Sequence, residues 1–127
     1  SPIAQYEGYY ASIFYSHFAA MGLDIRLEDV TNHGRIDMTV LFNGRVFIFE
    51  FKVVSDRAQG KAGNKTGRGK ASGGRSGGAS SKGTALQQIK DRGYADKYRA
   101  RGEPIHLIGV EFGKNSRNIV GFEVETA

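Results

Sequence analysis

The dipeptide Asn43-Gly44 lies between two runs of alternating apolar and polar residues, and it limits the fold more than any other short stretch. Asn and Gly both tolerate the positive φ angles of a tight two-residue turn, so the flanking runs are predicted to form a β-hairpin. In such a turn Phe42 faces Arg45, and that pair sets the register of the two strands. The sequence therefore predicts a hairpin over residues 34–53.

This register places Asp37 directly opposite Glu50, and the alternation of side chains along a strand puts Lys52 on the same face. The other face is predicted to be core, formed by Ile36, Met38, Val40, Phe42, Phe47, Phe49 and Phe51. Two facing carboxylates repel each other, by up to about 1 kcal/mol at an exposed site and by more where water is excluded. A hard divalent cation such as Mg²⁺ or Mn²⁺ would offset this repulsion. The alternative is an ordinary hairpin that carries surface charges.

Length and composition indicate one domain with a modest core, since the chain has 127 residues of which 39% are hydrophobic. No stretch approaches the roughly 20 apolar residues of a transmembrane helix. The absence of Cys excludes disulfides, zinc thiolates and cysteine nucleophiles. No secretory signal pattern precedes Met21, so a cytoplasmic location is the default expectation. A start at Ser1-Pro2 without Met suggests either a trimmed chain or a domain excised from a larger parent protein.

The net charge of +5 comes from one segment, residues 55–84, which holds seven Lys or Arg, one Asp and nine Gly. Its only apolar residue type is Ala, so it cannot bury enough surface to offset the entropy lost on ordering, and a flexible, disordered insertion is predicted. The insertion is either a solvated linker or an arm that lies along phosphates, with an affinity that falls with salt. The arm's contacts would come from Lys61, Lys65, Arg68, Lys70, Arg75 and Lys82.

Helical spacing of apolar residues predicts a helix over residues 3–21, with Glu7 and His17 within or beside its apolar stripe. A carboxylate on a packing face needs a partner, so Glu7 is either a structural residue or part of the site. His17 is interpreted as a histidine at the edge of the stripe, and His33 as a solvated turn residue, with a catalytic role as the alternative for each.

The remaining elements follow in order along the chain. A strand is predicted over 23–30, and residues 84–87 have the form of a capping box that begins a second helix. This helix is expected to run to about Arg101, with Gly93 as a weak point, and strands are predicted over 104–112 and 118–125. Helix, strand, hairpin, helix, strand, strand is the order of an α/β fold with helices against a mixed sheet.

The motif GRID at 34–37, followed after twelve residues by EFK at 50–52, resembles the PD-(D/E)XK nuclease superfamily, whose core is α-β-β-β-α-β. A closer likeness is to the nuclease-like domain at the C-terminus of certain bacterial and archaeal proteins that carry an AAA-type ATPase domain. The stretch ALQQIKDRGYADKY at 85–98 matches that family's second helix, with Gln88 and Tyr94 in its Q-x5-Y element. The sequence departs from that family in lacking the ATPase part and in the length of its glycine-rich segment.

The resemblance implies a three-layer, restriction-endonuclease-like core of the form α-β-β-β-α-β-β. It also implies Mg²⁺- or Mn²⁺-dependent hydrolysis of phosphodiester bonds, most readily in DNA. By resemblance, the metal would be held by Asp37, Glu50 and the backbone carbonyl of Phe51. Lys52 would orient or deprotonate the attacking water or stabilise the phosphorane.

Two further residues would assist by resemblance: Glu7 would act on the metal through water, and Gln88 would position substrate or a ligand water. Tyr94 lies six residues after Gln88 and so off its helical face, which favours packing over chemistry. The resemblance also allows a homodimer and an ATPase domain in a longer parent chain. The alternative function is a catalytically inactive nuclease-fold module that binds nucleic acid or a protein partner.

Overall fold

The computed structural model describes residues 2–56 and 83–127, so residues 57–82 of the predicted insertion lie outside the described residues. The elements are α1 (Pro2–Ala20), β1 (Asp24–Thr31), β2 (Gly34–Phe42), β3 (Arg45–Val54), α5 (Ala85–Asp91), the 3-10 helix η1 (Tyr94–Arg101), β5 (Ile105–Gly113) and β6 (Ile119–Thr126). One sheet has the order β1-β2-β3-β5-β6, parallel only between β3 and β5. The predicted α/β class with a mixed sheet is confirmed. None of the described helices is long and apolar enough to cross a membrane.

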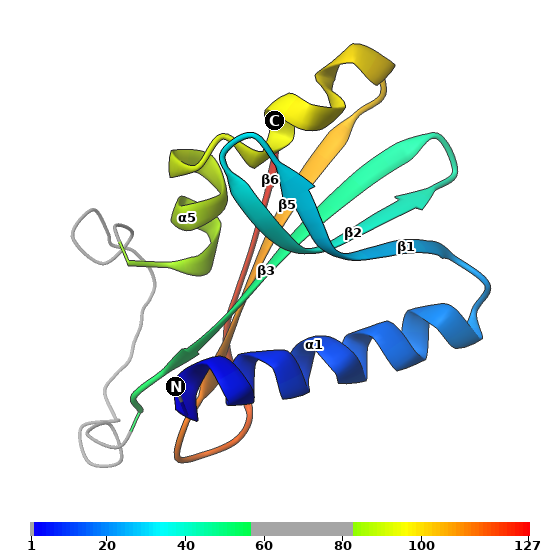
Figure 1. Cartoon of the computed structure of the whole chain (residues 1–127). Helices are drawn as coiled ribbons and strands as arrows, with labels where there is room; N and C mark the ends of the chain where they lie inside the picture. Colours follow the sequence, from blue (N-terminus) through cyan, green and yellow to red (C-terminus); the bar gives the residue numbers. More distant parts are fainter. Residues whose placement is uncertain (1, 57–82) are drawn as a thin grey trace.

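Helices cover both faces of this sheet, with α1 along one side and α5 on the other (Figure 1). Beneath α1, Phe14 and Phe18 pack on Phe49 and Phe51 of β3. Beneath α5 and η1 lies a second cluster, formed by Ile36, Val46, Ile48, Ile89, Tyr94, Ala95, Tyr98, Ile105 and Leu107. The face of β3 that carries Glu50 is therefore also core over half its length, whereas the sequence predicted core on the opposite face alone.

The register predicted from Asn43-Gly44 is confirmed from Phe42–Arg45 to Met38–Phe49. The ladder ends there, so Asp37 and Glu50 are not a ladder pair. The assignment of Ile36 to the same face as Met38 was wrong, because these residues pack in opposite clusters although they are two apart. The backbone of β2 must therefore twist between them, at Asp37.

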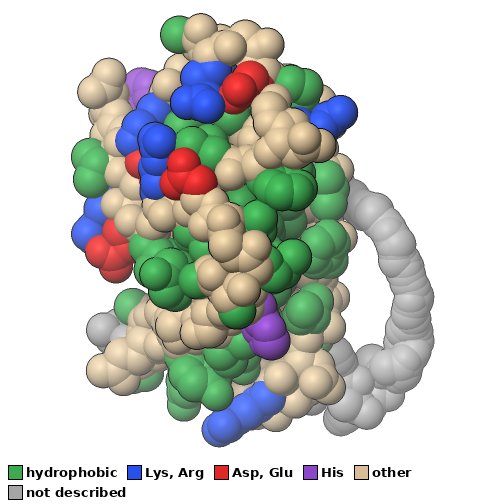
Figure 2. Space-filling view, turned by 90° about the vertical axis from the view of Figure 1, so that its right-hand side faces the viewer, with side chains coloured by type: hydrophobic (Ala, Val, Ile, Leu, Met, Phe, Trp, Pro, Cys, Tyr) green, Lys and Arg blue, Asp and Glu red, His purple; other side chains and the backbone are tan. Residues whose placement is uncertain are grey.

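The free end of the hairpin carries an apolar groove of about 310 Å³, lined by Phe18, Met21, Leu23, Val40, Phe42, Phe47 and Phe49. Figure 2 views the molecule from this side, and hydrophobic side chains gather near the centre of the view. Phe42 was predicted to be core, but its place at the tip of the hairpin leaves it 53% exposed.

The predicted second helix is not continuous. Thr84 caps α5 as expected, because its side chain accepts a hydrogen bond from the Gln87 N–H. Gly93 has φ of +61°, which is outside the helical range and breaks the segment into α5 and η1. The break reorients η1, so that Tyr94 and Tyr98 enter the core beneath it.

Candidate active site

The site lies where β2 and β3 separate. Beyond the Met38–Phe49 pair, Asp37 Oδ2 accepts the backbone N–H of Phe51 at 2.8 Å. On the other side of β2, Glu28 faces this position in β1 and has φ of +48°. The Asp37 carboxylate thus takes the place of a strand carbonyl as the hydrogen-bond acceptor for β3.

Glu7 makes the same kind of contact from α1. Its Oε2 accepts the backbone N–H of Val53 at 3.1 Å, two residues beyond Phe51 on β3. Alternate N–H groups of a strand point to the same edge, so the N–H groups of Phe51 and Val53 both face the edge of β3 that pairs with β2. The two carboxylates therefore accept the hydrogen bonds that carbonyl groups of β2 would accept if the ladder continued. Glu7 is therefore brought to Asp37, and both line an acidic groove of about 450 Å³ formed by Ala4, Glu7, Gly8, Ala11, Ser12, Leu27, Glu28 and Asp37.

Glu50 is the most buried acid of the site, with 6% of its surface exposed. Gln88 Nε2 donates to its Oε2 at 2.6 Å, whereas Oε1 is buried without a hydrogen-bond partner in the described part of the chain. Burial and, to a smaller extent, the negative charges of Asp37 and Glu7 raise the pKa of Glu50 to about 8, although the charges of Arg92 and Lys52 lower it. The two cations therefore compensate an ionised Glu50 only in part.

Asp37 is perturbed in the same direction. Burial, together with the negative charges of Glu7 and Glu28, raises its pKa to about 6 even though the hydrogen bond from the Phe51 N–H favours the ionised form. Like charges close together in a partly dry site disfavour ionisation of each. The site therefore gathers carboxyl groups whose negative charge its own cations, Lys52 and Arg92, offset only in part.

Gly109 explains how Gln88 reaches Glu50. It lies beside Glu50 in the parallel ladder of β3 and β5, and a Cβ placed on it would be 2.3 Å from the backbone N of Leu86. Only a residue without a side chain lets α5 approach the sheet this closely. The first turn of α5 therefore rests on β5, and Gln88 is aimed at the carboxylate.

Lys52 follows on the same face as Glu50, as expected, and is partly buried. Its partner in the parallel ladder is Glu111 of β5, which the sequence reasoning missed. Glu111 Oε2 accepts the N–H of Ala85 at 2.9 Å, and burial raises its pKa while the charge of Lys52 lowers it. The charge of Lys52 thus lowers the pKa of two carboxyl groups, those of Glu50 and Glu111.

Arg92 is the second residue that the sequence reasoning missed. Its guanidinium lies 3.4 Å from the Tyr94 hydroxyl, and its charge lowers the pKa of Glu50. The signal was present in the sequence, because Arg92 is four residues after Gln88 and so shares its face of α5. Tyr94 is 1% exposed and belongs to the core, in agreement with the packing interpretation, and its hydroxyl lies near Gly34.

The two histidines lie away from this constellation. His17 is exposed on α1 ten residues after Glu7, about 15 Å along the helix. His33 is exposed in the β1–β2 turn, where its Nε2 lies 3.8 Å from the Asp96 carboxylate. The basic side chains from Lys61 to Lys82 that were predicted to contact phosphates lie outside the described residues.

Comparison with known proteins agrees with this geometry. The sequence model of the PD-(D/E)XK nuclease superfamily matches residues 5–122, a range that includes both carboxylates, Lys52 and Gln88. The chain belongs to the PD-(D/E)XK nuclease superfamily. The five-stranded mixed sheet between helices is consistent with the restriction-endonuclease-like fold of this superfamily.

A relative of this superfamily member is known in Azotobacter chroococcum mcd 1, described as an uncharacterized protein in the vnfD 5' region. The two are 61% identical over 126 residues, which cover 99% of this chain and 20% of the relative. The chain thus spans about a fifth of the length of the curated relative it matches. No solved structure matches the chain.

PD-(D/E)XK nucleases usually use divalent metal ions, and the residues present fit such an ion. In residues 2–56 and 83–127, no three His, Cys, Asp or Glu side chains form a cluster that could hold a metal. The fit instead rests on the unpartnered Glu50 Oε1 and on two carboxylates with raised pKa values. Two carboxylates with water are a common way of holding Mg²⁺.

Proposed function

We propose that this chain is a metal-dependent nuclease domain that hydrolyses phosphodiester bonds, with DNA as the first substrate to test. The observation that carries the proposal is the buried Glu50 Oε1, which has no hydrogen-bond partner within the described residues and lies in a site of concentrated negative charge. A buried, unpaired charge is costly, so a site of this kind favours a cation. Mg²⁺ and Mn²⁺ match the all-oxygen ligand set.

Each residue has a separate role in this proposal. Asp37 and Glu50, with the carbonyl of Phe51, would hold the metal, which when bound supplies a more acidic water and a positive charge facing the phosphate. Lys52 would orient the attacking water or face the negative charge that develops on the phosphate. Gln88 fixes one oxygen of Glu50 and leaves the other available. Glu7 would contact the metal through water.

The structure suggests a better-matched variant than alanine for testing this proposal. Asp37→Asn keeps an oxygen that can accept the Phe51 N–H but removes the charge. Mn²⁺ is titrated calorimetrically into the wild type, Asp37→Asn and a control, Glu125→Gln, whose carboxylate pairs with Lys90 on the exposed surface. We expect binding by the wild type and the control, and a loss of at least tenfold in affinity for Asp37→Asn.

The same proteins are then incubated with linear, circular and branched DNA in the presence of Mg²⁺ or Mn²⁺. We expect cleavage by the wild type and Glu125→Gln, but not by Asp37→Asn or Glu50→Gln. Equal cleavage by the wild type and Asp37→Asn would contradict the proposal. DNA binding without metal binding would instead favour the catalytically inactive module.

The relative from Azotobacter, of which this chain covers 20%, supports the further proposal that the domain functions within a longer protein. An AAA-type ATPase domain in that parent, a homodimer and a cytoplasmic location remain part of the proposal. Mass spectrometry of the protein, expressed from its own promoter and then purified, would measure the length of the parent chain. Light scattering would test whether it forms a dimer.

A further inference from the structure

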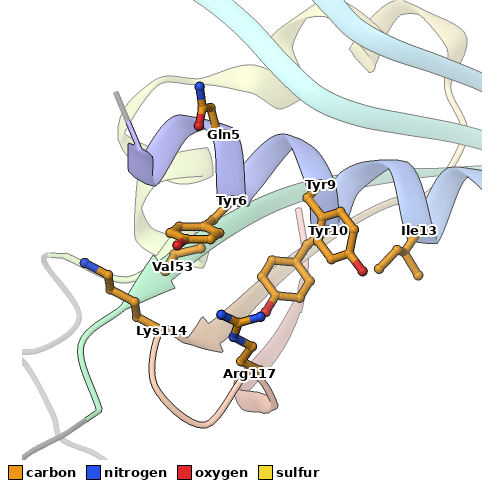
Figure 3. Close-up of a pocket in the computed structure, with 8 residues that line it drawn as sticks. All are labelled: Gln5, Tyr6, Tyr9, Tyr10, Ile13, Val53, Lys114 and Arg117. Atoms are coloured by element: carbon orange, nitrogen blue, oxygen red, sulfur yellow. The ribbon is translucent and has the colours of Figure 1, made fainter.

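A second hollow lies on the flank of α1 opposite the acidic groove, and the side chains that line it are suited to binding an unpaired nucleotide. It has a volume of about 520 Å³, within the usual range for ligand sites, and we call it the tyrosine groove. Its lining comes from α1, the end of β3 and the β5–β6 turn, and consists of Gln5, Tyr6, Tyr9, Tyr10, Ile13, Val53, Lys114 and Arg117 (Figure 3).

On the aromatic side of the groove, Tyr10 is held by stacking, whereas Tyr6 and Tyr9 are exposed. The ring of Tyr10 stacks on Phe112 of β5, with centroids 3.8 Å apart and planes 4° apart. Tyr9 meets Tyr10 edge-on at 5.4 Å and is 61% exposed, and Tyr6 is 37% exposed. Tyrosine rings held in this way can stack with a base of any sequence, provided that the base is not already stacked within a duplex.

The opposite wall carries positive charge without a counter-charge. Lys114 and Arg117 form no ion pair with any residue that the structure describes. Among the described residues, five of the eight other exposed basic side chains are paired with carboxylates, namely those of Arg35, Lys90, Lys97, Arg99 and Arg101. Figure 3 shows the Arg117 guanidinium close to the hydroxyl end of Tyr10, and Lys114 on the side of Tyr6 and Val53.

The turn that carries these two cations is held in place. Both oxygens of Asp56 accept backbone N–H groups of the turn, from Asn115 at 2.8 Å and Ser116 at 3.1 Å. The Lys114 N–H donates to the Val54 carbonyl at 2.8 Å. Arg117 has φ of +60°, a conformation that non-glycine residues adopt at a free-energy cost and that often marks functional positions.

The tyrosine groove adjoins the candidate active site. Val53 lines the groove and donates its N–H to Glu7, which lines the acidic groove on the other flank of α1. One helix, about 10 Å across, separates the two hollows. A strand held with one phosphate at Asp37 and Glu50 must therefore pass α1 before it meets the tyrosines, which would bind a nucleotide more than one position away.

We propose that the tyrosine groove binds an unpaired nucleotide of the substrate, with its base on Tyr6 and Tyr9 and its phosphate on Lys114 and Arg117. The inference rests on the proposed nuclease function and deepens it, since it assigns single-stranded or frayed nucleic acid as the substrate class. A duplex has no free base for the tyrosines and gains only the phosphate contact.

Fluorescence anisotropy of labelled oligo-dT and of a duplex of equal length, measured in EDTA so that no cleavage occurs, tests the groove. The double variant Tyr6→Leu/Tyr9→Leu keeps the apolar bulk, and Tyr15→Leu is its control, an exposed tyrosine of α1 outside the groove. We expect the double variant to bind oligo-dT about tenfold more weakly with an unchanged salt dependence. Duplex binding should change less than threefold.

The charged wall is tested with Lys114→Gln/Arg117→Gln, against Lys90→Gln/Arg99→Gln as a control of equal net charge. Loss of two phosphate contacts should lower the slope of log K against log salt by about 1.4 for a single strand. Circular dichroism verifies that each variant is folded. The control pair should leave the slope within about 0.3 of the wild type.

Three results would overturn the inference: no binding of oligo-dT by the wild type, equal binding by wild type and both groove variants, or equal loss for single strand and duplex. None of these results touches metal binding at Asp37, so failure of the groove is distinguishable from failure of the nuclease. Conversely, groove-dependent binding of oligo-dT by a protein that cleaves nothing would refute the nuclease and retain the groove.

Discussion

Replacing Glu50 with Gln is expected to stabilise the metal-free protein at alkaline pH, although it removes a proposed metal ligand. A carboxyl group whose pKa is higher in the folded than in the unfolded state stabilises the fold below its unfolded pKa. That stability is lost as the pH rises through the folded pKa. For Glu50 the two values are 4.5 and about 8, so the wild type should lose stability across this window.

The magnitude follows from these two values. Since a tenfold change in an equilibrium constant is about 1.4 kcal/mol, the free energy of unfolding of the wild type should fall by roughly 4 kcal/mol between pH 5.0 and pH 8.5 through this group. The side-chain amide of the Glu50→Gln variant carries no charge and can still accept the hydrogen bond from Gln88. From pH 5.0 to pH 8.5, the free energy of unfolding of Glu50→Gln should therefore rise relative to that of wild type by about 2 to 4 kcal/mol. This change corresponds to roughly 8 to 16 °C in Tm.

The assay is urea unfolding in EDTA at the two pH values, followed by circular dichroism. Glu125→Gln is the matched control, because its exposed ion pair with Lys90 should contribute less than about 1 kcal/mol at either pH. Adding Mn²⁺ at pH 8.5 should reduce the advantage of the variant, since wild type gains about 2.7 kcal/mol at a hundredfold excess over Kd. An equal stability difference at pH 5.0 and pH 8.5 would refute the reasoning.

Three other perturbations have defined outcomes. Because the pKa values of Asp37 and Glu50 are raised to about 6 and about 8, metal must displace protons. Mn²⁺ affinity should therefore rise up to about tenfold per pH unit between pH 6 and 8, and calorimetry in buffers of different ionisation enthalpy would detect the released protons. Gly109→Ala should displace α5, destabilise the fold by about 1–3 kcal/mol in urea unfolding and lower cleavage, whereas Gly8→Ala, in open space on α1, should not destabilise the fold. Deletion of residues 57–82 should leave Mn²⁺ affinity unchanged but flatten the salt dependence of DNA binding, and an unchanged slope would identify the segment as a linker.

The parts of the site that follow from local chemistry could be predicted from sequence. The Asn43-Gly44 turn determines the register by itself, because a two-residue loop admits one pairing of its flanks, and that register holds to Met38–Phe49. The capping role of Thr84 is equally local. Gly93 was recognised as a weak point, but whether a glycine breaks a helix depends on the packing of Tyr94 on the other side of it.

The parts that depend on distant segments could not be predicted. The ladder stops at Met38 because the Asp37 carboxylate binds a main-chain donor, and no pairing rule accounts for a side chain acting as a strand neighbour. The close approach of α5 depends on Gly109, which lies beyond the basic insertion in sequence. Glu111 belongs to the site only because β5 pairs with β3, which puts it beside Lys52.

The separation of β2 from β3 at Asp37 limits the substitutions that this domain can accept during evolution. Asp37 and Glu7 satisfy the Phe51 and Val53 amides, so each carboxylate that we propose for the chemistry also serves the backbone of β3. Replacement of either residue by an apolar one would leave a part-buried amide of β3 unsatisfied, at about 1–3 kcal/mol for each. Asn and Gln keep an acceptor, and they are therefore the substitutions by which a descendant of this domain can lose the proposed metal ligands while it keeps its fold.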